Sequence, residues 1–146
     1  MGRLLIVLTL LVVGCAPRLA PTYRDYVASA EAPADRTATV REAATEAGWT
    51  VTESGVRSVV STAPMRISTG VFSRVDASLD LAPLDGRYVR VYVHAVRRSV
   101  FGTRSKLPAL SRSLRDRALG DLTRALAARG LTALDAPRDR DEEATD

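Results

Sequence analysis

Two stretches of alternating residues, 71–81 and 88–98, constrain the fold of this chain more than any other feature. Apolar side chains occupy mainly the odd positions of both stretches, and polar or mixed side chains occupy the even positions. A period of two residues is typical of a β-strand with one buried face. The segment Pro83-Leu84-Asp85-Gly86 between them has the composition of a turn. The sequence therefore predicts an antiparallel hairpin whose odd-numbered side chains face a hydrophobic core.

The turn also predicts the register of this hairpin. Centred on Asp85, it pairs odd residues across the two strands: Leu81 with Val89, and Leu79 with Val91. It also brings acids close to bases on the other face: Asp80 to Arg90, and Asp76 to His94. A slip of two residues would exchange every pair but keep each side chain on its face, because side chains alternate with a period of two.

Two helices and a second pair of strands are predicted around this hairpin. Apolar residues at helical spacing indicate a helix from Thr39 to Gly48 and a long helix from Ser111 to Arg129, which Gly130 ends. Alternating or β-branched residues indicate strands at 49–53 and 56–62. We therefore expect an α+β fold, in which an antiparallel sheet of about four strands carries the N-terminal helix and the long C-terminal helix on one face.

The first fifteen residues have the pattern of an export signal. Arg3 precedes an apolar run, which ends at the small residue Gly14, just before Cys15, the only cysteine. The run is shorter than the roughly 20 residues that span a bilayer core. Val12-Val13-Gly14-Cys15 resembles a bacterial lipobox. The resemblance implies cleavage before Cys15 and attachment of a diacylglyceryl group to its sulfur, with a fatty acyl chain such as palmitate on its amine.

Two other interpretations of this segment remain open: an uncleaved N-terminal membrane helix, and ordinary secretory cleavage that leaves a free thiol. The lipobox resemblance implies a protein of the cell envelope, held on a membrane by its lipid. The residue that follows the cysteine is Ala16, not an aspartate. By resemblance to enteric lipoproteins, this residue favours the outer membrane, with the protein facing the periplasm.

These patterns divide the chain into four parts. Residues 1–14 are interpreted as a signal peptide, 15–36 as a lipidated N-terminus and tether, 37–132 as the α+β domain, and 133–146 as a disordered acidic tail. Three prolines favour an extended tether. Tyr23 and Tyr26 interrupt this tether, and we expect them to dock onto the domain.

Two further segments carry a second resemblance. Glu46-Ala47-Gly48-Trp49 connects a predicted helix to a predicted strand, and residues 59–64 form the end of the next strand, which stops at a proline. With the order of helix, two hairpins and long helix, these segments loosely resemble the helix-grip modules of envelope accessory lipoproteins, such as a lipoprotein subunit of the outer-membrane barrel-assembly machine. The resemblance implies an accessory role and transfers no functional residue.

Catalytic chemistry has little support in the sequence. Acid–base catalysis needs positioned titratable groups, and His94 is the single histidine. The predicted register places Asp76 near His94, and Ser78 lies on the same face of the strand pair. A hydrolase that uses His94 is therefore one hypothesis, although the sequence contains no nucleophile-elbow motif. One cysteine and one histidine predict no metal site. No glycine-rich phosphate motif indicates a cofactor.

The mixed face of the hairpin carries tyrosine and arginine, which are enriched at binding hot spots. We predict a partner-binding surface formed by Phe72, Arg74, Tyr88, Arg90, Tyr92 and His94. A second basic cluster is interpreted as a solvated loop, with contact to anionic headgroups as the alternative: Arg97, Arg98, Arg104, Lys106 and Arg112. Aromatic residues make up only 5% of the chain, which argues against a stacking surface for nucleic acid.

Together these features predict a non-enzymatic, lipid-anchored accessory protein of the envelope that binds a protein partner. A different class of function is the binding of a small lipid or glycan ligand in a cavity between helix and sheet. The hydrolase hypothesis is the third alternative.

Overall fold

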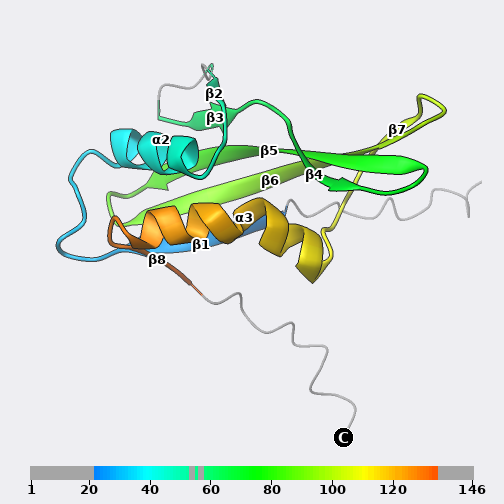
Figure 1. The fold of residues 1–146 in the computed structure, drawn as a ribbon. Helices are drawn as coiled ribbons and strands as arrows, with labels where there is room; N and C mark the ends of the chain where they lie inside the picture. Colours follow the sequence, from blue (N-terminus) through cyan, green and yellow to red (C-terminus); the bar gives the residue numbers. More distant parts are fainter. Residues whose placement is uncertain (1–21, 53–54, 56–57, 135–146) are drawn as a thin grey trace, which may run out of the picture.

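The computed structural model describes residues 22–52, 55 and 58–134. In this part of the chain, eight strands form one antiparallel sheet, and the helices α2 (Arg36–Glu46) and α3 (Arg112–Ala127) lie on one of its faces (Figure 1). The predicted signal peptide, the predicted lipobox with Cys15 and residues 135–146 of the predicted tail lie outside the described residues.

The sheet is built around a long hairpin of β5 (Ser73–Leu84) and β6 (Tyr88–Ser99). The other strands are shorter: β1 (Thr22–Ala28), β2 (Val51–Thr52), β3 (Val60–Thr62), β4 (Met65–Thr69), β7 (Arg104–Lys106) and β8 (Leu131–Ala133). The strand order is β2-β3-β5-β6-β1-β8, and β4 pairs with β5 while β7 pairs with β6. One half of the hairpin is therefore flanked by β3 and β1, and the other half by β4 and β7.

The predicted fold class was wrong. The described part of the chain is mostly β, with eight strands instead of about four, and its helices are short, of 11 and 16 residues. The strands that sequence reasoning missed are β1, β4, β7 and β8. Each has at most seven residues and pairs with a strand distant in sequence or with the hairpin. Such strands depend on tertiary pairing more than on local propensity.

The two faces of the hairpin were predicted correctly, but its register was wrong by two residues. Leu81 pairs with Val91 and Leu79 with Val93. The turn centres on Gly86 because β5 continues to Leu84 and β6 begins at Tyr88. Asp85 and Gly86 have φ values of 47° and 66°, so the chain reverses through two left-handed residues.

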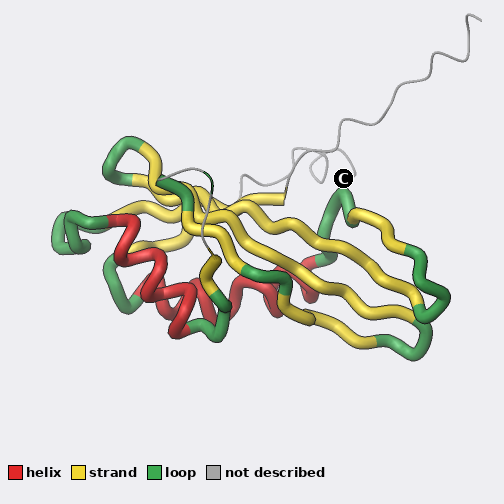
Figure 2. Tube along the Cα trace, turned by 90° about the horizontal axis from the view of Figure 1, so that it is seen from above, coloured by secondary structure: helices red, strands yellow, loops and turns green. Residues whose placement is uncertain are grey.

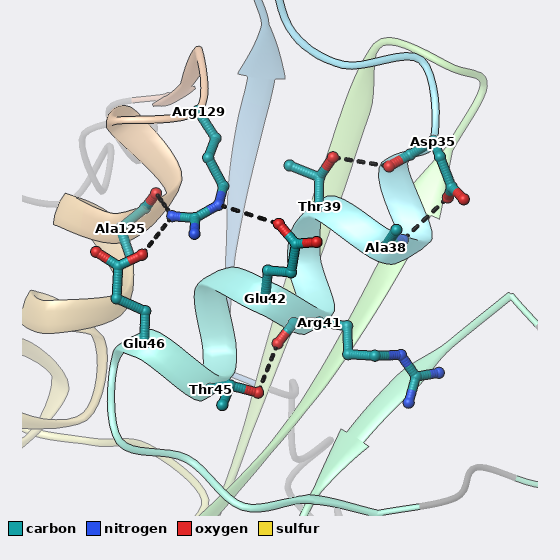
Figure 3. Close-up of polar contacts among 9 residues, drawn as sticks. All are labelled: Asp35, Ala38, Thr39, Arg41, Glu42, Thr45, Glu46, Ala125 and Arg129. Atoms are coloured by element: carbon teal, nitrogen blue, oxygen red, sulfur yellow. Dashed lines mark hydrogen bonds and ion pairs between the residues drawn. The ribbon is translucent and has the colours of Figure 1, made fainter.

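The helices are fixed at their ends by local polar contacts (Figure 3). Asp35 caps α2, because its carboxylate accepts a 2.9 Å hydrogen bond from the Ala38 amide. Arg129, which follows α3, forms an ion pair with Glu46 at 2.7 Å and donates to the carbonyl of Ala125 at 3.0 Å. This guanidinium therefore joins the C-terminal ends of the two helices.

The core lies between the helices and the odd-numbered face of the hairpin. The largest fully buried side chains come from both layers: Leu79, Leu81, Val89 and Val91 from the hairpin, Leu119, Leu122 and Leu126 from α3, and Val40 from α2. Seen from above, both helices lie on the same side of the sheet (Figure 2). We call the other side the open face; it carries the even-numbered side chains of β5 and β6.

Strand β1 lies in the segment that was predicted to be a tether. It pairs with β6 on one side and β8 on the other, and it carries the two tyrosines that were expected to dock. Tyr26 is fully buried and shares a 2.9 Å hydrogen bond with Thr123 of α3, whereas Tyr23 lies on the open face. Residues Thr22–Ala28 of the expected tether are therefore part of the sheet.

Burial of Tyr26 predicts a loss of stability in alkali. Desolvation raises the pKa of its phenol above 10.0, and the hydrogen bond with Thr123 offsets part of this effect. The unfolded chain then ionises Tyr26 at lower pH than the folded chain, so its contribution is complete below about pH 10 and is lost as the pH rises through the folded pKa. We expect Tyr26→Phe to lessen the alkaline decline in the free energy of unfolding, measured by urea denaturation at about pH 8 and about pH 11. Equal declines in both proteins would contradict this prediction.

Candidate functional site

The structure distributes the six predicted binding residues along the whole hairpin. Arg90, Tyr92 and His94 are successive open-face positions near the middle of β6, and Tyr88 begins the same strand. Arg74 lies toward the far end of β5. Phe72 precedes β5 and belongs to the loop after β4. The structure therefore brings Arg90, Tyr92 and His94 together and separates Phe72 and Arg74 from Tyr88 by most of the hairpin's length.

Arg90 is the centre of a cluster shared with β1. Asp25 stands directly opposite and accepts two hydrogen bonds from the guanidinium, at 2.7 and 2.8 Å. The guanidinium carbon of Arg90 lies 4.3 Å from the ring centre of Tyr23, whose ring centre is 6.2 Å from that of Tyr92. The hydrogen bonds with Asp25 raise the pKa of Arg90. A bidentate ion pair stacked on a ring holds the side chain in one geometry.

Sequence reasoning missed Tyr23 and Asp25 as members of this site. Both lie in the segment that was predicted to be a tether, so no pairing with the hairpin was expected. The available signal was alternation in Thr22–Ala28, where Tyr26 and Ala28 are buried and Tyr23 and Asp25 face the other side.

A row of apolar side chains lies beside the Arg90 cluster. Leu84 pairs with Tyr88, and Tyr88 pairs with Val27 of β1. Leu84, Tyr88 and Tyr23 are among the exposed large hydrophobic residues. We call the combined area the tyrosine surface, defined by Tyr23, Leu84, Tyr88, Arg90 and Tyr92.

His94 is not arranged as a catalytic base. Its Nε2 lies 2.9 Å from Asp80 Oδ2, while the Ser61 hydroxyl donates to the other oxygen of Asp80 at 2.7 Å. Ser61 and His94 thus both bind the Asp80 carboxylate, whereas an activated nucleophile requires the serine to bind the histidine. The predicted Ser78 stands directly opposite His94 in the sheet, but the hydrogen bond of His94 goes to Asp80. The predicted neighbour Asp76 pairs with Arg74 and Arg98 instead. The imidazole is also half-exposed, so its surroundings do not exclude water.

The far end of the open face is strongly basic. Arg74 stands directly opposite Arg98, and Arg98 opposite Arg104, so three arginines form one row across β5, β6 and β7. We call them the arginine row. The neighbouring row adds Arg66 and Lys106 and one carboxylate, Asp76. Like charges placed directly opposite one another destabilise a sheet. Sheet stability therefore does not explain this arrangement.

Asp76 neutralises only part of this charge. It lies 2.8 Å from Arg98 Nε and 3.5 Å from Arg74 Nε. The contact with Arg98 is an ion pair without hydrogen-bond geometry, and this buried Nε has no hydrogen-bond partner among the described residues. A surface hollow of about 440 Å³ is lined by Arg66, Arg74, Arg98 and Arg104, among others. The cluster that was interpreted as a solvated loop is thus mostly sheet, since Arg97, Arg98, Arg104 and Lys106 belong to paired strands and Arg112 begins α3.

In the part of the chain that the structure describes, no group of three or more His, Cys, Asp and Glu side chains is placed to hold a metal ion. None of the helices in those same ranges is long and apolar enough to cross a membrane. Comparison with models of known protein families, with curated proteins and with solved structures finds no match to this chain.

Proposed function

We propose that this protein is a non-enzymatic, lipid-anchored binding protein of the cell envelope, whose tyrosine surface binds a partner protein. The lipobox at Val12-Val13-Gly14-Cys15 supports the anchor and the envelope location. The observation that carries the binding proposal is the Arg90 cluster. There, an arginine bound by a carboxylate and stacked on a tyrosine ring is held rigidly on a sheet face that neither helix covers.

Rigidity makes this surface suited to binding. Ordering a long side chain at an interface costs free energy, and a side chain that is already ordered avoids this cost. Asp25 binds Nε and one terminal nitrogen of the Arg90 guanidinium, and Tyr23 covers its plane. Tyrosine and arginine together account for many of the residues that dominate measured interfaces.

The charge balance of the surface indicates the kind of partner. Asp25 already neutralises Arg90, so this area does not offer a free cation to an acidic partner. The neighbouring Leu84 and Tyr88 offer apolar area instead. We therefore expect a partner surface with apolar side chains at its centre and hydrogen-bonding groups at its rim.

A photo-crosslinking experiment in the native host tests this proposal. A photoreactive amino acid at position 88 is expected to give a discrete adduct with one envelope protein in intact cells. The same group at position 117, an exposed site on α3 on the other side of the sheet, is the matched control and is expected to give none. Absence of an adduct at position 88, or the same adduct at position 117, would reject the binding surface.

Substitution then measures the contribution of the surface. We expect Tyr92→Ala to weaken binding of the crosslinked partner about tenfold or more, as for a hot-spot residue, and Arg117→Ala to leave it unchanged. Mass spectrometry of the mature N-terminus tests the anchor separately. A diacylglyceryl group on Cys15 is expected, and an unmodified thiol or a retained leader would reject the anchor.

The alternative of a ligand cavity between helix and sheet is less well supported. The side chains at that position, including Leu79, Leu119 and Leu122, are fully buried and form one core cluster. Packed interiors leave few voids larger than a water molecule. Hollows lined by described residues lie elsewhere, one at the arginine row and one between the end of α2 and the second half of α3.

A further inference from the structure

The two loops at the basic end of the hairpin carry the most exposed apolar side chains of the described chain. Val71 and Phe72, in the loop between β4 and β5, are 84% and 69% exposed. Val100 and Phe101, in the loop between β6 and β7, are 64% and 84% exposed. We call these four residues the apolar tip. Large apolar side chains gathered on an exposed surface mark an interaction site.

The apolar tip is one preformed structure. The Val100 amide donates to the carbonyl of Phe72 at 3.0 Å, so the two loops are joined. Gly70 closes the first loop by donating to the Ser73 carbonyl at 2.7 Å, and the hydroxyls of Ser99 and Thr103 lie 2.7 Å apart across the second. Both loops also lie at the same end of the sheet (Figure 1). The exposed side chains are therefore displayed together.

The arginine row lies directly behind this tip. Arg98 and Arg104 flank the second loop in the sequence, and Arg74 follows the first. Guanidinium groups bind phosphate oxygens with two parallel hydrogen bonds. Asp76 is the single carboxylate among the five cations Arg66, Arg74, Arg98, Arg104 and Lys106, so this end of the sheet keeps binding capacity for an anion. The apolar side chains thus lie at the very end of the hairpin, and the cations lie next to them in the sheet. This order matches the layers of a bilayer surface, where acyl chains lie beneath phosphate headgroups.

We propose that this end of the hairpin binds an anionic phospholipid bilayer: the apolar tip enters the interface and the arginine row holds headgroup phosphates. The shape favours a bilayer over an acidic protein. The tip protrudes as two loops and presents aliphatic and phenyl groups, which fit a fluid acyl layer without a complementary pocket.

The direction of β1 agrees with this orientation. β1 runs antiparallel to β6 and begins at Thr22 opposite Val93, so its first residue faces the end of the sheet that carries the tip. Thr22 and Cys15 are seven positions apart in the sequence, which spans at most about 25 Å. Val93, the partner of Thr22, and Val100 of the apolar tip are also seven positions apart, which is about 23 Å along a strand. Cys15 can therefore reach the level of the tip. This agreement rests on the proposed lipid at Cys15, whereas the apolar tip and the arginine row do not.

A labelling experiment tests the insertion without the anchor. A chain of residues 16–146 keeps the whole described core, which lies between Tyr26 and Leu131, and contains no cysteine. Phe101→Cys then provides a single site for a polarity-sensitive fluorophore. We expect a blue shift with vesicles that contain phosphatidylglycerol and little change with phosphatidylcholine alone. Tyr88→Cys, at the opposite end of the hairpin, is the matched control and is expected to show no shift.

Vesicle co-sedimentation with unlabelled variants separates the two parts of the site. Phe72→Ser combined with Phe101→Ser should reduce binding to the anionic vesicles about tenfold or more. Arg104→Gln combined with Lys106→Gln should reduce it about fivefold for each charge removed. Arg41→Gln combined with Arg117→Gln removes the same charge from exposed helical positions and should leave binding unchanged. Circular dichroism verifies that every variant is folded.

Three outcomes would overturn the proposal. One is that neither vesicle composition shifts the label or sediments the protein. Another is that inorganic phosphate at about millimolar concentration displaces the protein completely, which would identify a site for free phosphate. The third is a blue shift with polyglutamate but none with vesicles, which would identify an acidic polypeptide as the partner. None of these results bears on the crosslinking at position 88, so the two proposals fail independently.

Discussion

Replacing Leu79 with aspartate is expected to abolish the folded state at room temperature. Leu79 is fully buried in the middle of β5, opposite Val93, on the face that the helices cover. The substitution loses about 3 kcal/mol of apolar burial and cavity energy and adds several kcal/mol for a carboxyl group without partners. A domain of this size has a total stability of about 5–15 kcal/mol. Circular dichroism and urea denaturation of the purified variant measure the result.

Ser78→Asp is the matched control, because it adds the same charge one residue earlier in the same strand. Ser78 lies on the open face, directly opposite His94. A carboxylate there remains partly solvated and faces a base. We expect the free energy of unfolding to change by less than about 1 kcal/mol. If Ser78→Asp unfolds the protein and Leu79→Asp does not, the two faces of the hairpin have been assigned the wrong way round.

This pair of substitutions tests what the sequence determined most firmly. Alternation with a period of two specifies which side chains are buried, and it assigned Leu79 and Ser78 to opposite faces correctly. Alternation does not specify register, because a slip of two residues preserves both faces. The register depends on the left-handed conformations of Asp85 and Gly86. The composition of the turn indicated a reversal but did not determine its centre.

The missing strands have a different cause. β4 and β7 have five and three residues and form by pairing with the ends of the hairpin. A segment of this length has too few residues for a pattern to emerge, and its hydrogen bonds are supplied by a partner strand. The three residues of the arginine row were singled out in the sequence, but their alignment in one row was not predicted, for the same reason. Arg104 comes to lie opposite Arg98 only when β7 pairs with β6.

The proposed binding sites follow from the length of the hairpin. β5 and β6 each have 12 residues, and the flanking strands differ along them. Near the turn, β1 adds Tyr23 and Asp25 to the open face and completes the tyrosine surface. At the far end, β4 and β7 add basic side chains and bring the two apolar loops together. One hairpin thus separates the proposed protein-binding area from the proposed membrane contact.

Strand β1 connects these arguments, and Tyr26→Ala tests whether it belongs to the fold. If residues 15–36 were only a tether, removing this side chain would cost almost nothing. In the structure, Tyr26 is fully buried, lies opposite Val89 and hydrogen bonds with Thr123 of α3. We expect the free energy of unfolding to fall by about 3–5 kcal/mol, as for other large aromatic residues cut back to alanine in a core. Urea denaturation at neutral pH measures this change.

Tyr23→Ala, three residues earlier in the same strand, is the matched control. It separates the effect of losing a buried side chain on stability from the effect of losing any aromatic ring in β1. Tyr23 is 47% exposed and contributes its contact with Arg90. An exposed cation–π contact is worth about 1 kcal/mol or less, so this variant should remain nearly as stable as the parent. Equal effects of the two substitutions would mean that β1 is not packed as described. The tyrosine surface would then lose Tyr23 and Asp25, and with them the rigid support of Arg90 on which the proposed function depends.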